Sequence, residues 1–154
     1  MGSPVLVSPV AFNHVGLVVT DLERAKRFYC DALGFQPWYE LHPPDEPTAR
    51  LSSLTPPLDL TASYLTLGGL VLELLHYAAL DISSRRRTMG EAGLSHLSVS
   101  VDDVHETATA AIALGGSVIE GSDLGNALFI RDPDGQLIEL LTSSYRDTLP
   151  PMPS

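Results

Sequence analysis

The chain has 154 residues, of which 44% are hydrophobic, and a formal net charge of −10 at pH 7. This composition is sufficient for a buried core and argues against a disordered chain. The negative charge argues against polyanionic partners, so we expect neither nucleic acid nor a membrane surface as a partner. The single cysteine, Cys30, allows no intrachain disulfide. With no recognisable signal segment or membrane-spanning stretch, we expect a cytoplasmic protein.

The first half of the chain, residues 12–77, follows an expected tail at residues 1–11. A Val-rich strand opens it, and Thr20 and Glu23 then have the spacing of a capping box at the start of a helix. Residues 42–60 are rich in proline and predict an irregular connection. The remaining elements that we predict are the strands at 12–19, 35–41, 61–67 and 70–77 and a short helix at 47–54.

A linker at residues 78–93 leads into the second half, residues 94–143, and we expect another tail at 144–154. The arginines at 85–87 are interpreted as solvent-exposed linker, with contact to an anionic substrate as the alternative. A second amphipathic helix follows the first strand of this half, with an apolar stripe at Val104, Ala108, Ala111 and Ile112. The strands predicted here lie at 94–101, 117–120, 127–131 and 137–142.

One pattern occurs in both halves. His14 and His96 each open an apolar strand and are followed seven residues later by an Asp. Glu73 and Glu139 each interrupt an apolar strand four residues after a glycine. Two copies of one pattern predict two similar units related by a pseudo-twofold axis.

The four repeated residues are expected on one face of a curved sheet, because strand side chains alternate between faces. Their apolar neighbours point to the other face, where the helices would cover them. An isolated carboxylate in an apolar strand is costly, and a bound cation would stabilise both. Imidazole and carboxylate suit one divalent ion per site, either Zn, Ni, Co, Mn or Fe. The predicted ligands are His14, Glu73, His96 and Glu139, and an ordinary edge or surface position is the alternative for each residue alone.

The chain resembles the vicinal oxygen chelate superfamily, which includes glyoxalase I, methylmalonyl-CoA epimerase, extradiol dioxygenases and the fosfomycin and bleomycin resistance proteins. The resemblance runs from Phe12 to about Thr142. It implies an α+β fold of paired βαβββ modules that form a curved, cup-like mixed sheet with helices on the outer face. It also implies a homodimer and the same four ligands, as in the His/Glu/His/Glu set of glyoxalase I. The stretches that carry it are Asn13-His14-Val15-Gly16-Leu17, Phe28-Tyr29, Leu33-Gly34-Phe35, Leu72-Glu73-Leu74, Leu94-Ser95-His96-Leu97, Arg131-Asp132-Pro133-Asp134-Gly135 and Ile138-Glu139-Leu140.

The chemistry expected of such a site is metal-dependent, glyoxalase-like lyase or isomerase chemistry on a small oxygenated substrate, by epimerase-type proton abstraction next to a carbonyl. Glu139, with Glu73 as the second candidate, would serve as the base. Two alternatives stay open at this point: an Fe(II)-dependent extradiol-type dioxygenase, and a protein that binds a drug or natural product. Apolar substrate contacts are expected from the same face, with plain packing as the alternative, at Leu75, Tyr77, Leu137 and Leu141.

Overall fold

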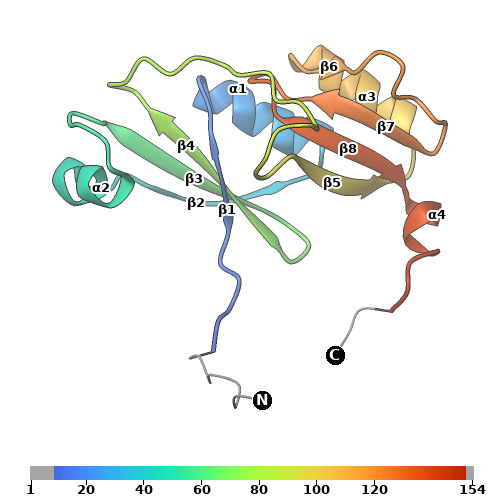
Figure 1. The fold of residues 1–154 in the computed structure, drawn as a ribbon, viewed down its shortest axis with the longest axis horizontal. Coiled ribbons are helices and arrows are strands. Elements are labelled where there is room, and N and C mark those ends of the chain that lie inside the picture. The colour runs from blue at the N-terminus through green and yellow to red at the C-terminus, as the bar shows by residue number, and fades with distance from the viewer. Residues whose placement is uncertain (1–8, 152–154) are drawn as a thin grey trace.

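The computed structural model describes residues 9–151, apart from the side chain of residue 146, and contains two four-stranded mixed sheets (Figure 1). The first has the strand order β1-β4-β3-β2 and the second the order β5-β8-β7-β6. The strands are β1 (Val15–Val18), β2 (Gln36–Leu41), β3 (Leu60–Leu67), β4 (Leu70–Tyr77), β5 (His96–Val101), β6 (Ser117–Val118), β7 (Ala127–Arg131) and β8 (Leu137–Thr142). The predicted α+β fold with a curved mixed sheet is confirmed, and the strands form two separate open sheets.

The two sheets are built in the same way. In each, the first strand runs parallel to the last, β1 beside β4 and β5 beside β8, and the other pairs are antiparallel. The chain's internal repeat is therefore a repeat of topology as well as of sequence. The helices are α1 (Leu22–Arg27), its continuation η1 (Phe28–Ala32), α2 (Asp45–Ser52), α3 (Val104–Ala113) and α4 (Ser143–Arg146).

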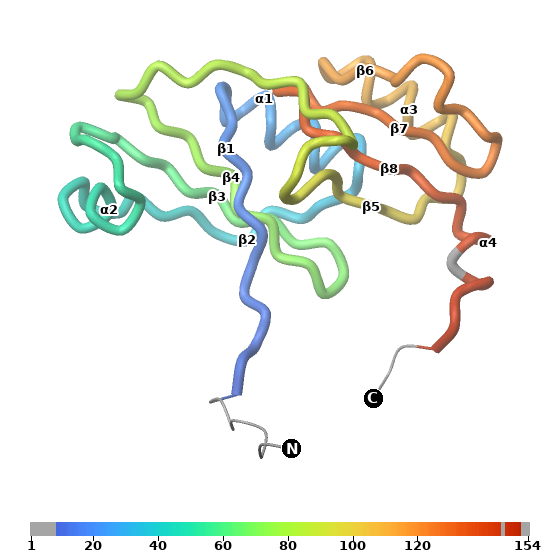
Figure 2. Tube along the Cα trace, viewed as in Figure 1, coloured from blue at the N-terminus to red at the C-terminus, as the bar shows by residue number. Residues whose placement is uncertain are grey.

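A continuous core joins the two halves on the helix side of the sheets. The residues that flank the two glutamates along their strands have no exposed surface: Leu72, Leu74, Ile138 and Leu140. The predicted alternation of faces is thus confirmed for β4 and β8. Figure 2 shows the α1 segment behind β1 and the linker, and η1 makes contact with α3, so helices from both halves share this core.

The turn between β7 and β8 ties the second half to the first. Tyr29 is fully buried in η1 and donates its hydroxyl hydrogen to Asp132, 2.8 Å away and only 5% exposed. Burial raises the pKa of both groups, and for Tyr29 the neighbouring Asp132 carboxylate adds to the effect. The backbone N–H and the hydroxyl of Thr20 donate to Asp134 at 3.0 and 2.5 Å. These buried polar groups are mutually satisfied, as the interior of a protein requires.

Two local predictions were wrong. The N-cap of α1 is Asp21, which accepts from the backbone N–H of Arg24, rather than Thr20. Thr20 is instead bonded to the distant Asp134, a contact that local sequence does not reveal. Ile112 is 54% exposed, because the buried face of α3 follows Val104, Ala108 and Ala111, and the next position turns away from the sheet.

The expected tails, residues 1–11 and 144–154, lie partly outside the described residues, which begin at 9 and end at 151. Helix α4 falls at the start of the second of these segments. No helix within the described residues is long and apolar enough to span a membrane.

Candidate metal half-sites

The first His–Glu pair lies on the open face of the first sheet. His14 directly precedes β1, and its Nε2 lies 3.0 Å from Oε2 of Glu73 in the middle of β4. The side chain of Glu73 is 13% exposed and that of His14 is 33% exposed. Nδ1 of His14 lies 2.5 Å from Oδ1 of Asn13, and this contact is a hydrogen bond in the tautomer that carries its ring hydrogen on Nδ1. A second ring nitrogen fixed in this way is typical of histidines whose other nitrogen binds a metal.

The second pair repeats this arrangement on the second sheet. His96 opens β5, and its Nε2 lies 3.7 Å from Oε2 of Glu139 in β8, with both side chains 25% exposed. Nδ1 of His96 is 2.8 Å from the hydroxyl of Ser95. Ser98 donates its hydroxyl hydrogen to Oε2 of Glu139 at 2.7 Å. Each half therefore presents one imidazole nitrogen and one carboxylate to the same side of its sheet.

An aromatic ring stands beside each imidazole, and only one of the two rings carries a hydroxyl. Tyr64 packs edge-on against His14 with ring centroids 5.7 Å apart, and Phe129 packs against His96 at 5.3 Å. Each ring belongs to the residue paired with the glutamate on the adjacent strand. The Tyr64 hydroxyl donates to Oε1 of Glu73 at 2.5 Å. Burial and this hydrogen bond raise the pKa of Tyr64.

Sequence reasoning missed Tyr64, although a signal for it existed. A two-residue hairpin turn at Gly68-Gly69 fixes the register of the strands it joins, and that register places Tyr64 opposite Glu73. The row continues across the sheet to Tyr39 of β2, whose ring stacks on Tyr64 with centroids 4.4 Å apart. Trp38, beside an irregularity in β2, is 61% exposed. The open face beside Glu73 is therefore aromatic.

The two pairs do not meet within one chain. Among the described side chains, no three His, Cys, Asp or Glu residues lie close enough together to hold a metal ion. The structure brings His14 to Glu73 and His96 to Glu139, each pair on its own sheet. Nitrogen and carboxylate oxygen are suitable ligands for the expected metals, but each pair supplies only two of the four ligands of a tetrahedral set or of the six of an octahedral set. The four-ligand site remains a prediction that requires a second pair from elsewhere.

The four apolar residues expected near the substrate differ in exposure. Tyr77 is 9% exposed and packs in a small second core with Ala49, Leu58 and Leu60, under α2. Leu137 is 3% exposed, and Leu75 and Leu141 are half-buried. Packing is the role that the contacts of Tyr77 support, and contact with a substrate remains a prediction for all four.

Comparisons with known proteins agree with this architecture. The sequence model of the Glyoxalase/Bleomycin resistance protein/Dioxygenase superfamily matches residues 11–140. The chain belongs to this superfamily.

Individual relatives are similar over most of the chain. A probable lactoylglutathione lyase of Synechocystis is 29% identical over 144 residues, which cover 87% of this chain and 97% of the relative. A probable lactoylglutathione lyase of Vibrio parahaemolyticus is 27% identical over 138 residues, 83% of this chain and 87% of the relative. A glyoxalase family protein of Bacillus cereus superposes with a TM-score of 0.74 at 18% identity, covering 91% of this chain and 98% of that one, and this likeness supports the fold.

Proposed function

We propose that the chain is a metal-dependent lyase or isomerase that removes a proton next to the carbonyl group of a small oxygenated substrate. The observation that carries this proposal is the pair of matching half-sites, each with an imidazole nitrogen and a carboxylate facing one another. The names of the Synechocystis and Vibrio parahaemolyticus relatives support the lyase side of it. In this proposal residues 12–77 and 94–143 act as two modules of one catalytic design.

The complete site is assembled, in this proposal, between two chains. His14 and Glu73 of one chain would lie opposite His96 and Glu139 of a second, so a twofold homodimer would contain two equivalent sites. Two imidazoles and two carboxylates suit a single divalent ion of the Zn, Ni, Co, Mn or Fe group. When bound, such an ion supplies Lewis acidity that stabilises negative charge on substrate oxygen.

The two carboxylates differ in their hydrogen bonds, and this difference supports the roles that we propose for them. Both oxygens of Glu73 are engaged, Oε2 with His14 and Oε1 with Tyr64. His96 and Ser98 both face Oε2 of Glu139, and among residues 9–151 its Oε1 has no hydrogen bond. A carboxylate that can rotate and offer a free oxygen is the better proton acceptor. Glu139 is therefore the proposed base, and Glu73 is proposed as a fixed ligand.

A mixing experiment tests assembly between chains. One variant carries His14→Ala and Glu73→Ala, and the other carries His96→Ala and Glu139→Ala, so neither binds metal alone. If each site spans two chains, unfolding and refolding a 1:1 mixture creates mixed dimers with one intact site. Metal content should then recover to about one quarter of the wild-type value, as expected for random pairing in a twofold dimer.

The outcomes separate the alternatives. No recovery in the mixture, with full metal content in the wild type, would place all four ligands in one chain and contradict the shared site. Activity is then measured with α-keto, thioester and catechol substrates on protein loaded with each metal. Dioxygen consumption with a catechol would favour the oxygenase, and tight substrate binding without turnover would favour a binding protein.

A further inference from the structure

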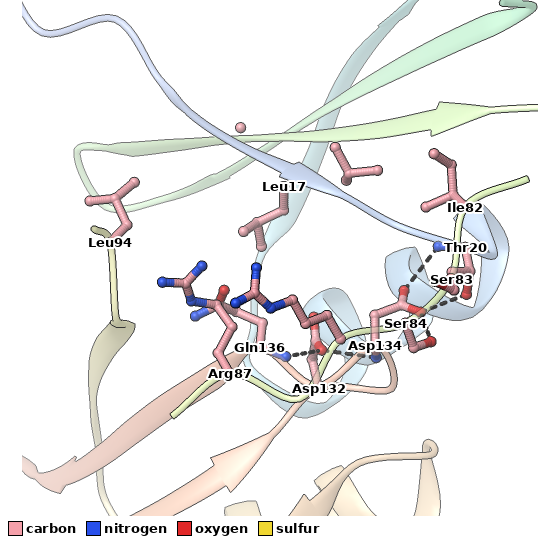
Figure 3. Close-up of a pocket in the computed structure, with 13 residues that line it drawn as sticks. Leu17, Thr20, Ile82, Ser83, Ser84, Arg87, Leu94, Asp132, Asp134 and Gln136 are labelled. Carbon is pink, nitrogen blue, oxygen red and sulfur yellow. Dashed lines mark hydrogen bonds between the residues drawn. The ribbon is translucent and has the colours of Figure 1, made fainter. Parts of the chain in front are cut away.

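A cavity of about 420 Å³ lies between the two halves of the chain (Figure 3). None of the four predicted metal ligands lines it. Its walls come from β1 and Thr20, from the linker with Leu94, and from the β7–β8 turn. This volume falls within the range of pockets that hold small organic molecules, about 300–1,000 Å³.

The linker wall is fixed by hydrogen bonds to the turn. The backbone N–H of Arg85 donates to the carbonyl of Asp134 at 3.1 Å, and that of Arg87 donates to the carbonyl of Gly135 at 3.3 Å. Arg131 donates in turn to the carbonyls of Arg87 and Gly135, at 2.5 and 3.0 Å. Gly135 has a φ of +95°, and a Cβ atom there would lie 2.6 Å from the carbonyl oxygen of Arg85, so the linker approaches the turn as closely as a glycine allows. The linker backbone at Arg85 and Arg87 is thus held in place at the cavity.

The two carboxylates that line the cavity are already saturated. Asp132 accepts hydrogen bonds from the Tyr29 hydroxyl and from the backbone N–H groups of residues 134 and 136. Asp134 accepts from the backbone and hydroxyl of Thr20, from the Ser84 hydroxyl and from Arg24. Among the described residues, neither carboxylate accepts a hydrogen bond from Arg87, and the one cation bonded to them is Arg24.

Two cationic side chains line the cavity, Arg85 and Arg87, and Arg85 is paired with Glu91, which leaves Arg87 as the cation that faces the cavity. Figure 3 shows its side chain reaching into the cavity from the linker. Its Nε is buried and has no hydrogen-bond partner within residues 9–151. The carboxylate of Glu91 is bound by the backbone N–H of Thr88 and by Arg85, and these contacts lower its pKa. A buried cationic donor without a partner is costly, and a planar guanidinium is suited to bind the two oxygens of a carboxylate or phosphate.

We propose that this cavity binds a small organic anion, with its carboxylate or phosphate group on Arg87 and its apolar part against Leu17 and Leu94. Leu17 lies in the wall formed by β1, and Leu94 stands at the rim with 77% of its surface exposed. The chain's net charge of −10 disfavours loose accumulation of anions, so binding here depends on the local guanidinium. The anion would join the linker to both halves of the chain.

Isothermal titration calorimetry on metal-free, full-length protein tests the proposal with three probes: inorganic phosphate, butyrate and butyl phosphate. We expect butyrate or butyl phosphate to bind more tightly than inorganic phosphate, because the apolar walls add contact that phosphate alone cannot use. Which of the two butyl compounds binds more tightly identifies the acid group that the site prefers. Arg87→Gln should weaken binding about 10-fold or more, as loss of a hydrogen bond to a charged group implies. Arg86→Gln is the matched control, since it removes the same charge from an exposed neighbour outside this cavity, and it should bind as the wild type does.

A second variant leaves Arg87 unchanged, so that the test does not depend on whether Arg87→Gln folds. Leu94→Glu places a carboxylate at the exposed rim of the cavity and should weaken anion binding without disturbing the core. Absence of binding by all three probes up to about 10 mM, weaker than the affinity expected of a specific small-ligand site, would overturn the proposal. Equal weakening by Arg86→Gln and Arg87→Gln would also overturn it, because the effect would then follow net charge.

Discussion

The two half-sites differ in the hydroxyl of Tyr64, which Phe129 lacks in the second half-site. The substitution Tyr64→Phe removes this hydroxyl and keeps the ring against His14. The lost hydrogen bond, 2.5 Å long and made to a carboxylate that is 13% exposed, belongs to a class that contributes about 1.5–3 kcal/mol. Partners that hold metal-binding side chains typically contribute 10–100-fold to metal affinity. If Glu73 is a fixed ligand, the variant should bind a divalent ion about 10-fold more weakly.

The assay is competition for Zn²⁺ with a chromophoric chelator, which reports affinity without any substrate. Tyr39→Phe is the control, because it removes a hydroxyl from the ring stacked on Tyr64 but leaves the Glu73 hydrogen bond in place. An unchanged affinity in Tyr64→Phe would refute the reasoning that this hydroxyl holds a metal-binding carboxylate. An equal loss in both variants would assign the effect to the aromatic stack instead.

Three further outcomes follow from the structure. Glu139→Gln should retain near-normal metal content and lose about 10²–10⁴-fold in rate, which is the usual contribution of a general base. Glu73→Gln should lose less rate. A larger loss in Glu73→Gln at equal metal content would exchange the roles of the two carboxylates. Gly116→Ala should lower the free energy of unfolding by about 1–3 kcal/mol in urea titrations, because the new Cβ would lie 2.6 Å from the carbonyl oxygen of Arg131 and 2.7 Å from the buried ring of Phe28. An unchanged free energy of unfolding would contradict this close packing. The hydrogen bond to Asp123 raises the pKa of His105, so Asp123→Asn should lower it in an NMR titration. The stability that this pair adds is fully present below the unfolded pKa of about 6.5 and is lost as pH rises through the folded value; an unchanged pKa in the variant would contradict the pairing.

Local rules of sequence were sufficient for most of the sheets. Period-two alternation places Leu72 and Leu74 in the core and Glu73 on the opposite face, and this follows from strand geometry alone. The hairpin at Gly68-Gly69 likewise sets the register of β3 and β4. The same rules predict that all four candidate ligands occupy equivalent positions in their two sheets, because the pattern is present twice in the chain.

Contacts between distant residues decided the rest. Alternation specifies the face of a strand on which a side chain lies, but not how the two sheets are oriented relative to each other. Only the packed structure therefore shows that the His14–Glu73 pair and the His96–Glu139 pair are separate within one chain. Thr20 is a good helix cap by local propensity, yet its backbone N–H and hydroxyl both donate to Asp134, which lies 114 residues later in the chain. Arg87 belongs to a run of arginines that predicts an exposed linker. It faces a cavity because Arg131 and the β7–β8 turn bind the linker backbone at Arg85 and at Arg87 itself. In each case the deciding interaction joins residues that are remote in sequence, and its energy depends on the packing of the whole chain.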